Sequence, residues 1–335
     1  MQYKSLIIMD PVQTHNIYGS EQVSAIKGMT DLLHSPMGKE EALARPDLLM
    51  KVNFIFSGWD SCILDETFLA SAPELKAVFY GAGSVRDIVT PAFWNSGIPL
   101  TTAYAANAVP VAEFTFAQII MALKKGQYLT RLCRENKRWE DQVPLTQIIP
   151  ACYGSTVGLV SLGMIGSRVL DFLQSLDVKI LVYDIVRNED LASEKNFEYV
   201  SLETIFSSSD VVSLHTANLP SPRKMISAGL LASMKKGAAL INTARGAIID
   251  EEGMIAVLKN RPDLEAYLDV LTQDPPEADN PLLFMPNVYI TPHIAGSMQT
   301  ECRRMGQMAV EECRRFLAGE KPLWPVTEKM METMA

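Results

Sequence analysis

The chain has 335 residues, 48% of them apolar and 21% charged, so it can bury a large core and more readily forms two domains than one. Its net charge of -9 and the lack of a basic run mixed with aromatic residues exclude nucleic acid as the main partner. Its 5 cysteines are widely spaced, which favours reduced thiols in a cytoplasmic protein, and no His, Cys and carboxylate cluster predicts a metal site.

The first third of the chain alternates short apolar runs with amphipathic segments, which predicts a small α/β domain. Its first apolar run, Leu6–Met9, is too short for a signal peptide and ends at Asp10. The predicted strands are Ser5–Met9, Val52–Phe56, Ala77–Phe79 and Leu100–Thr102. A helix is predicted between them at Asp65–Ala72, just before Pro73.

A strongly apolar helix is predicted from Pro110 to Leu123, because proline suits the first position of a helix. Glu113 and Gln118 interrupt its apolar surface, so a buried helix is favoured over a membrane span, and no membrane partner is expected. The next segment, Arg131–Tyr153, has weak periodicity and predicts a long surface connection.

A second, more regular series of strands and helices is long enough for a complete dinucleotide-binding domain. Its predicted strands are Thr156–Ser161, Lys179–Tyr183, Val211–Leu214, Ala238–Asn242, Leu264–Val270 and Val288–Ile290. The segment Ser297–Leu317 is again helical and is expected to return to the first domain. The predicted fold class is therefore α/β, with two Rossmann-like or flavodoxin-like domains built on parallel sheets. We place the discontinuous first domain at residues 1–103 and 297–335, and the second at 104–296.

A glycine-containing turn after the first strand of this series predicts a nucleotide site. Gly163 and Gly166 match the second and third glycines of G-x-G-x-x-G, whereas Ser161 replaces the first. Gly163 would let the backbone approach a pyrophosphate, Gly166 would let the helix pack on the strand, and the amides at the helix start would face the phosphates. An ordinary strand, turn and helix would also explain two glycines.

An acidic residue at the end of the next strand strengthens this prediction. Asp184 lies where a carboxylate accepts hydrogen bonds from the adenosine ribose, although an ordinary turn residue is the alternative. The two features in one strand–helix–strand unit favour NAD as the cofactor, while Arg187 leaves NADP open.

Three side chains after later strands suit chemistry on a small carboxylic acid. Arg245, in N-T-A-R-G, can hold a carboxylate by two parallel hydrogen bonds. His293, in T-P-H-I-A-G, can move a proton near neutral pH, and Asp274 can orient it. Taken singly, they are more often a surface ion-pair partner, a loop histidine and a turn former. Their order within a nucleotide-binding domain favours a site.

The chain resembles the D-isomer-specific 2-hydroxyacid dehydrogenases over nearly all its length, most strongly from Val157 to Gly296. The matching stretches are Y-G-A-G-S-V at Tyr80–Val85, A-N-A-V-P-V-A-E at Ala106–Glu113, Met234–Leu258, L-D-V at Leu268–Val270 and Pro286–Gly296. In that family the first is a glycine-rich substrate loop, and the second begins an interdomain helix that forms dimers.

The resemblance implies an NAD-dependent enzyme that transfers a hydride between nicotinamide and C2 of a small 2-oxo or 2-hydroxy acid, as a homodimer. Arg245 would bind the substrate carboxylate and 2-oxo group, His293 would be the general acid/base and Asp274 its partner. Residues implied to hold the carboxylate by their backbone amides are Ala82, Gly83 and Ser84. Residues implied to bind the cofactor are Gly163, Met164, Ile165, Gly166, Asp184, Thr216, Ala217, Thr243, Ala244, Asp269 (at the nicotinamide carboxamide) and Gly296.

Four positions depart from the family pattern. Ser161 replaces a glycine, Ala217 stands where proline is common, Ala82 replaces a frequent valine, and Asp274 replaces a glutamate that is one methylene longer. The shorter partner of the histidine requires a closer backbone, a bridging water or a weaker pair. Ser161 and Asp274 keep open an NAD(H)-binding sensor or corepressor-like protein with weak turnover. Other relatives keep open a formate- or phosphite-type dehydrogenase.

Two further side chains have a functional alternative. His215 follows a strand and is expected to pack in the core or behind the cofactor. Trp59 also follows a strand, so its ring is expected either to pack or to contact substrate.

Overall fold

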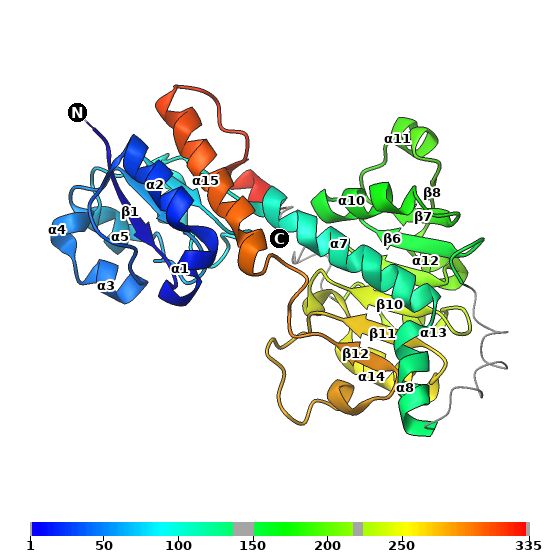
Figure 1. Ribbon diagram of the computed structural model, residues 1–335. Coiled ribbons are helices and arrows are strands. Elements are labelled where there is room, and N and C mark those ends of the chain that lie inside the picture. Colours follow the sequence, from blue (N-terminus) through cyan, green and yellow to red (C-terminus); the bar gives the residue numbers. More distant parts are fainter. Residues whose placement is uncertain (1, 137–150, 217–223, 333–335) are drawn as a thin grey trace. The chain divides into compact units, whose positions relative to one another are not determined.

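The computed structural model describes residues 2–136, 151–216 and 224–332. The chain divides into two compact units, the first formed by Met1–Ala108 and Ser297–Ala335 and the second by Val109–Gly296 (Figure 1). The first unit is therefore discontinuous, and the division after Ala108 lies inside a helix rather than after residue 103.

The first unit contains a six-stranded sheet in the order β13-β5-β4-β3-β1-β2. Its strands are β1 (Lys4–Ile8), β2 (Asp31–Leu32), β3 (Phe54–Ser57), β4 (Ala77–Tyr80), β5 (Leu100–Thr102) and β13 (Pro325–Val326). All pairs are parallel except β13 with β5. Without β13, this is the order of flavodoxin-like sheets. The four predicted strands are confirmed, with bounds that differ by at most two residues. The two-residue strands β2 and β13 are too short to show a pattern.

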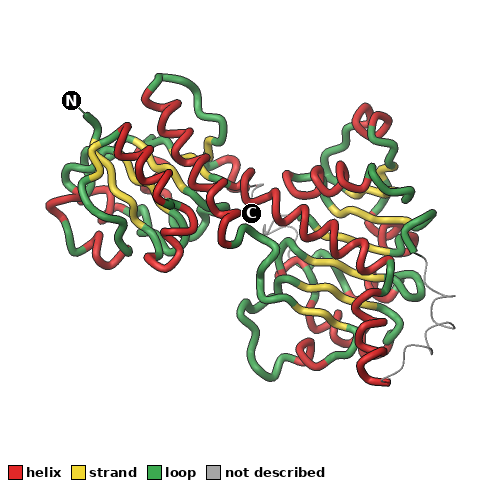
Figure 2. Tube along the Cα trace, viewed as in Figure 1, coloured by secondary structure: helices red, strands yellow, loops and turns green. Residues whose placement is uncertain are grey.

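Helices cover both faces of this sheet, as the tube in Figure 2 shows. They are α1 (Pro11–Ile17), α2 (Ser20–Met29), α3 (Lys39–Leu43), α4 (Pro46–Leu49), α5 (Glu66–Ser71), α6 (Pro91–Ser96) and α15 (Cys302–Leu317), with the 3-10 turns η4 (Gln299–Glu301) and η5 (Lys329–Glu332). Along β1, Leu6 and Ile8 pack towards α3–α6, whereas Ile7 packs with α1, α2 and α15. Burial on both faces explains why the strands are continuous apolar runs. The predicted return of the C-terminal helix to this unit is confirmed.

The second unit contains a seven-stranded, fully parallel sheet in the order β12-β11-β10-β9-β6-β7-β8. Its strands are β6 (Thr156–Val160), β7 (Lys179–Tyr183), β8 (Glu198–Tyr199), β9 (Val211–Leu214), β10 (Ala239–Asn242), β11 (Glu265–Leu268) and β12 (Val288–Ile290). The order is that of a Rossmann domain with one strand added at the β11 edge, and its switch point lies between β6 and β9. All six predicted strands are found, and β8 is a short addition.

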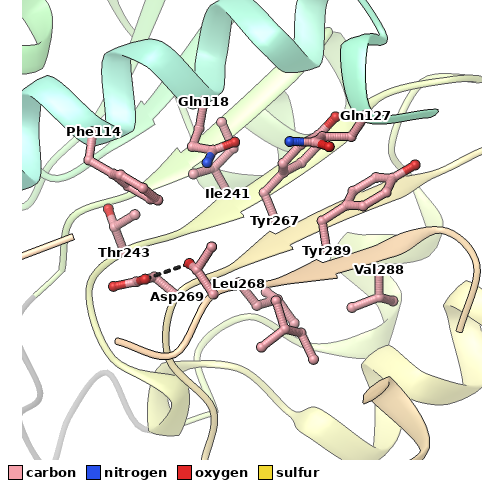
Figure 3. Close-up of a pocket in the computed structure, with 12 residues that line it drawn as sticks. Phe114, Gln118, Gln127, Ile241, Thr243, Tyr267, Leu268, Asp269, Val288 and Tyr289 are labelled. Carbon is pink, nitrogen blue, oxygen red and sulfur yellow. Dashed lines mark hydrogen bonds between the residues drawn. The ribbon is translucent and has the colours of Figure 1, made fainter. Parts of the chain in front are cut away.

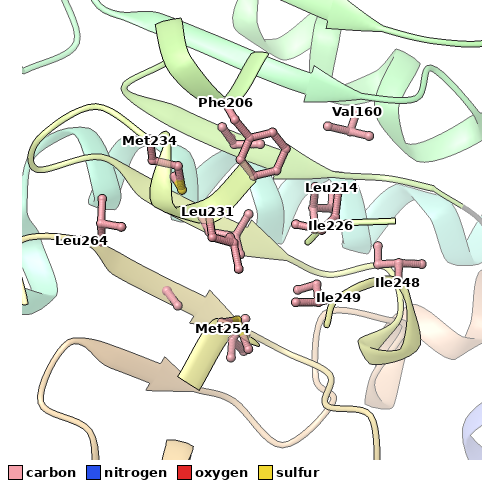
Figure 4. Close-up of a cluster of buried hydrophobic side chains, with 14 of the residues drawn as sticks. Val160, Phe206, Leu214, Ile226, Leu231, Met234, Ile248, Ile249, Met254 and Leu264 are labelled. Atoms are coloured by element: carbon pink, nitrogen blue, oxygen red, sulfur yellow. The ribbon is translucent and has the colours of Figure 1, made fainter. Parts of the chain in front are cut away.

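Each strand of the second unit except the short β8 places its apolar side chains alternately in two clusters. The helices are α7 (Tyr104–Leu123), α8 (Gly126–Asn136), α10 (Met164–Leu173), α11 (Glu189–Glu194), α12 (Leu202–Ser208), α13 (Ala228–Ala232) and α14 (Glu251–Asn260), with η2 (Gly246–Ile248) and η3 (Pro281–Phe284). Leu159 packs with α7 and α10, whereas Val160 packs with α12–α14 in the cluster of Figure 4. Each fully buried aliphatic side chain contributes roughly 1.5–3 kcal/mol.

The apolar helix α7 begins six residues earlier than predicted, at Tyr104, so Pro110 lies inside it and the prediction of a proline at the first position was wrong. An interior proline leaves the carbonyl of Ala106 without its helical partner. The earlier turns still form, because the amides of Ala106 and Asn107 bond to the carbonyl of Ala103 directly after β5. By length and composition α7 could cross a membrane, but half of its most apolar window is buried inside the fold.

The segment after α7 also differs from its prediction. Residues 131–136 are not a surface connection, because they form the last turns of the strongly amphipathic helix α8. The rest of that predicted connection, residues 137–150, lies outside the described part of the chain.

Candidate functional site

Most of the predicted site residues lie at the carboxyl ends of the strands of the second unit. The carboxyl ends of parallel strands meet at one edge of a sheet, and ligands bind there near the switch point. The turns after β6, β7 and β9 carry the nucleotide candidates, and those after β10, β11 and β12 carry Arg245, Asp274 and His293.

The turn between β6 and α10 has the shape that a pyrophosphate requires. Gly163 is the N-cap residue of α10, and a Cβ built there would meet no atom within 4 Å, so the helix start is open. A Cβ on Gly166 would lie 2.2 Å from the carbonyl oxygen of Ser161 and 3.3 Å from the Cβ of His215, so the helix packs against the turn as predicted. Met164 is 40% exposed beside this opening. The residues present therefore fit a dinucleotide phosphate.

Asp184, directly after β7, is bonded to the same turn. Its Oδ2 accepts hydrogen bonds from the amide of Leu162 at 2.6 Å and from the hydroxyl of Ser161 at 3.3 Å. Its Oδ1 accepts from the amide of Val186 at 2.9 Å. Ser161 has φ of 78°, the left-handed region that costs a residue with a Cβ roughly 1–2 kcal/mol. The side chains of Ile185 and Val186 are 85% and 73% exposed, so an apolar surface borders the carboxylate.

His215 is buried after β9, in agreement with the predicted packing role. Burial lowers the pKa of its ring to about 3, so it stays neutral and is no proton carrier near neutral pH. Its Nε2 lies 3.1 Å from the hydroxyl of Ser213, while its buried Nδ1 has no hydrogen-bond partner among the described residues. Thr216 follows with its hydroxyl 3.5 Å from the carbonyl of Val160, and Ala217 lies outside the described part of the chain.

The side chain of Asn242, the first residue of N-T-A-R-G, holds the turn after β10. Asn242 accepts a hydrogen bond from the amide of Ala244 at 3.0 Å and donates one to the carbonyl of Arg245 at 2.9 Å. A Cβ on Gly246 would lie 2.0 Å from the carbonyl carbon of Leu271, so only glycine lets the chain that leads to Asp274 pass so close. The half-buried Arg245 donates to the carbonyl of Ala244 at 2.7 Å.

The loop that carries His293 is built around the buried carboxylate of Asp269. Its Oδ1 accepts from the hydroxyl of Thr291 at 2.5 Å and from the amide of Ile294 at 2.9 Å, and its Oδ2 accepts from the amide of Ala295 at 2.9 Å. Asp269 is 3% exposed. His293 adopts a left-handed φ of 53°, and these bonds offset its strain of about 1–3 kcal/mol. In this structure Asp269 therefore positions the histidine loop.

His293 and Asp274 form a direct pair. The ring Nδ1 lies 2.6 Å from Oδ2 of Asp274, so Nδ1–H donates to the carboxylate and Nε2 remains for a substrate. Both side chains stay accessible, at 52% and 37% exposure. The shorter side chain of Asp274 therefore still reaches the ring directly.

Two cavities adjoin these residues. One, of about 330 Å³, lies between α7, α8 and the strands β10–β12, and Figure 3 shows Phe114 and Gln118 of α7 pointing into it above Thr243 and Asp269. Thr243 is buried with its hydroxyl 2.7 Å from that of Thr115. The nucleotide candidates Gly163 and Asp184 are not among the residues that line this cavity. The other, of about 480 Å³, is bordered by Asp274, Pro275, Pro276 and Pro292.

The predicted substrate loop belongs to the first unit, at the carboxyl end of β4. Ala82 is buried, and its carbonyl accepts from the amide of Ala103 at 2.9 Å. Gly83 and Ser84 are partly exposed, and a Cβ on Gly83 would meet only the Asn107 amide, at 3.6 Å. Trp59 is half-buried against both apolar clusters of this unit, which is the packing alternative.

Asn242 and Asn107 are supporting residues that no sequence motif assigned a role. The Oδ1 of Asn107 accepts from the amide of Ser297 at 2.9 Å, where the chain re-enters the first unit. Asn242 ends a strand just before a turn, a local signal for side-chain bonding to the backbone. Asn107 has no such signal, because its partner is distant in the sequence.

Comparison with known proteins gives a consistent result. Residues 116–295 match the model of the NAD binding domain of D-isomer specific 2-hydroxyacid dehydrogenases. The chain is 33% identical over 259 residues to a glyoxylate reductase of Korarchaeum cryptofilum (strain OPF8), covering 77% of this chain and 78% of that protein. It is 33% identical over 255 residues to an (S)-sulfolactate dehydrogenase of Chromohalobacter salexigens, covering 76% and 81%.

The same similarity extends to a solved structure. The NAD-complexed form of a D-isomer specific 2-hydroxyacid dehydrogenase from Lactobacillus delbrueckii ssp. bulgaricus aligns with a TM-score of 0.78 and 25% identity. The alignment covers 96% of this chain and 100% of the other.

Proposed function

The chain belongs to the D-isomer specific 2-hydroxyacid dehydrogenase family, an NAD-binding oxidoreductase family, and we propose that Arg245, Asp274 and His293 are its catalytic residues. The proposed reaction is reversible hydride transfer at C2 of a small 2-oxo or 2-hydroxy acid of D configuration. The observation that carries this proposal is the direct Asp274–His293 pair on a loop held by Asp269.

Arg245 is proposed to hold the substrate carboxylate. A guanidinium can bind a carboxylate through two parallel hydrogen bonds, and the same charge stabilises negative charge that develops on the 2-oxo oxygen. The clamp by Asn242 and the close packing of Gly246 fix the backbone on both sides of Arg245. We propose that the amides of Ala82–Ser84 supply a second contact to the carboxylate, which makes the first unit the substrate domain.

His293 is proposed to exchange the proton of the substrate oxygen through Nε2. In reduction the protonated ring donates to the oxygen at C2, and in oxidation the neutral ring takes the hydroxyl proton. Asp274 fixes the ring orientation by accepting from Nδ1. NAD, when bound, supplies or takes up the hydride. The residues proposed to hold it are Gly163, Met164, Ile165, Gly166, Asp184, Thr216, Ala217, Thr243, Ala244, Asp269 and Gly296.

The test of this function is NADH oxidation by the purified protein with glyoxylate, hydroxypyruvate, pyruvate and 2-oxoisocaproate. We expect turnover on at least one of them, because the relatives are named as reductases or dehydrogenases of such small acids. NADH binding without turnover on any of the four would favour the sensor alternative. Oxidation of formate or phosphite instead would favour the other class of relatives.

Replacing Asp274 by glutamate is expected to lower kcat by roughly tenfold. The contact of 2.6 Å leaves no room for another methylene, so the ring must turn or the backbone must withdraw. The measurement is kcat at saturating NADH, with Asp274→Asn as a control that keeps the length and removes the charge. A gain in rate for Asp274→Glu would show that the aspartate is an imperfect partner.

We also propose that the protein is a cytoplasmic homodimer associated through α7. This helix of 20 residues is strongly apolar, yet only half of its most apolar stretch is buried within its own chain. Met121 on this helix is 38% exposed. Light scattering on the purified protein measures the mass, and a monomer at micromolar concentration would contradict the proposal.

A further inference from the structure

We propose that Ser161 sets the affinity for the adenosine half of the cofactor, because its hydroxyl occupies an acceptor site on Asp184 that a ribose hydroxyl would otherwise use. The inference rests on the proposed role of Asp184 as the ribose acceptor. Ser161 stands where the nucleotide-binding pattern has its first glycine.

The geometry of the carboxylate carries the argument. A carboxylate has about four lone-pair sites, two on each oxygen. On Asp184, Oδ2 accepts from the amide of Leu162 at 2.6 Å and from the hydroxyl of Ser161 at 3.3 Å, so both of its sites are used. Oδ1 accepts from the amide of Val186 at 2.9 Å and keeps one site. Asp184 can therefore accept one further hydrogen bond, not two.

A ribose presents two neighbouring hydroxyl groups, and the strongest contact uses both oxygens of the carboxylate. With Ser161 engaged, the second ribose hydroxyl gains a bond only if the serine hydroxyl gives up its own. The two amide donors belong to the backbone of the turns and cannot leave in this way. Of the three groups that donate to Asp184, only the hydroxyl of Ser161 can therefore be removed by a substitution.

The backbone at this position separates two effects of a substitution. Ser161 has φ of 78°, where glycine is relaxed and any residue with a Cβ is strained. Ser161→Ala removes the hydroxyl and keeps the strain, whereas Ser161→Gly removes both. Glycine should therefore raise Tm by about 2 °C, and alanine should not.

The experiment measures dissociation constants by calorimetry for NADH, ADP-ribose and reduced nicotinamide mononucleotide, which lacks the adenosine half. We expect Ser161→Ala and Ser161→Gly each to bind NADH and ADP-ribose about three- to tenfold more tightly, the usual net effect of one additional hydrogen bond. The mononucleotide should bind as it does to the unchanged protein. The affinity for NADPH should increase less than the affinity for NADH, because the carboxylate of Asp184 repels a 2′-phosphate.

Ser167→Ala is the matched control, because that hydroxyl, on the first turn of α10, donates to the carbonyl of Leu162 in the same loop at 2.8 Å instead of to Asp184. It should change none of these affinities. Unchanged or weaker NADH binding in Ser161→Ala would overturn the inference, as would a gain in the glycine variant alone. Asp184→Ala separates the two proposals. If it leaves the ratio of NADH to mononucleotide affinity unchanged, the ribose role of Asp184 itself fails.

Discussion

Replacement of His293 by asparagine should lower kcat for reduction of a 2-oxo acid by about 10²–10⁴-fold, the usual contribution of general acid–base catalysis. Asparagine is the better substitution, because His293 has a φ of 53° and asparagine adopts this region more readily than alanine. The loop should therefore keep its backbone while the proton carrier is removed. His215 cannot replace it, since burial lowers the pKa of that ring to about 3.

The measurement is steady-state NADH oxidation together with the dissociation constant of NADH and Tm. We expect the NADH affinity to stay within about twofold and Tm to stay within a few degrees, because the side chain is half exposed. His293→Ala serves as the comparison and should have a lower Tm at a similar kcat. If His293→Asn retained kcat within about tenfold, the acid/base assignment would be wrong.

The two parallel sheets could be predicted from local sequence patterns. Strands buried on both faces leave continuous apolar runs, and neighbours such as Leu159 and Val160 serve opposite clusters, so the runs stand out between polar turns. Pro110 misled the prediction of a helix start. Proline prefers the first turn of a helix, but this preference is weak. The six residues before Pro110 extend the helix back almost to the end of β5 instead.

Less of the candidate site could be predicted than of the fold. Motifs indicated Arg245, Asp274 and His293, and the structure pairs the last two at 2.6 Å. The contact of Gly246 with the backbone of Leu271 depends on two turns that are distant in the sequence, so no local pattern contains it. The groups towards which a buried carboxylate points also depend on the tertiary structure. For this reason the sequence suggested a cofactor contact for Asp269 but not its three bonds to the histidine loop.

Replacement of Asp269 by asparagine should destabilise the protein by about 2–4 kcal/mol and lower kcat by at least about tenfold. The amide oxygen can still accept from Thr291 and Ile294, but the amide nitrogen would place a donor against the donor of Ala295. Both groups are buried, so water cannot relieve the clash, and the loop must move and displace His293.

Chemical denaturation measures the loss of stability, and steady-state kinetics with NADH binding measure the loss of function. Thr291→Val is the matched control, because it removes one donor and leaves both backbone amides bonded to the carboxylate, so its losses should be smaller. The outcome decides between two roles for Asp269. A fall in kcat and in NADH affinity with unchanged stability would mean that the carboxylate acts on the nicotinamide, as the family resemblance implies. A combined loss of stability and kcat, with NADH affinity retained, would mean that Asp269 acts by holding the left-handed histidine loop in place.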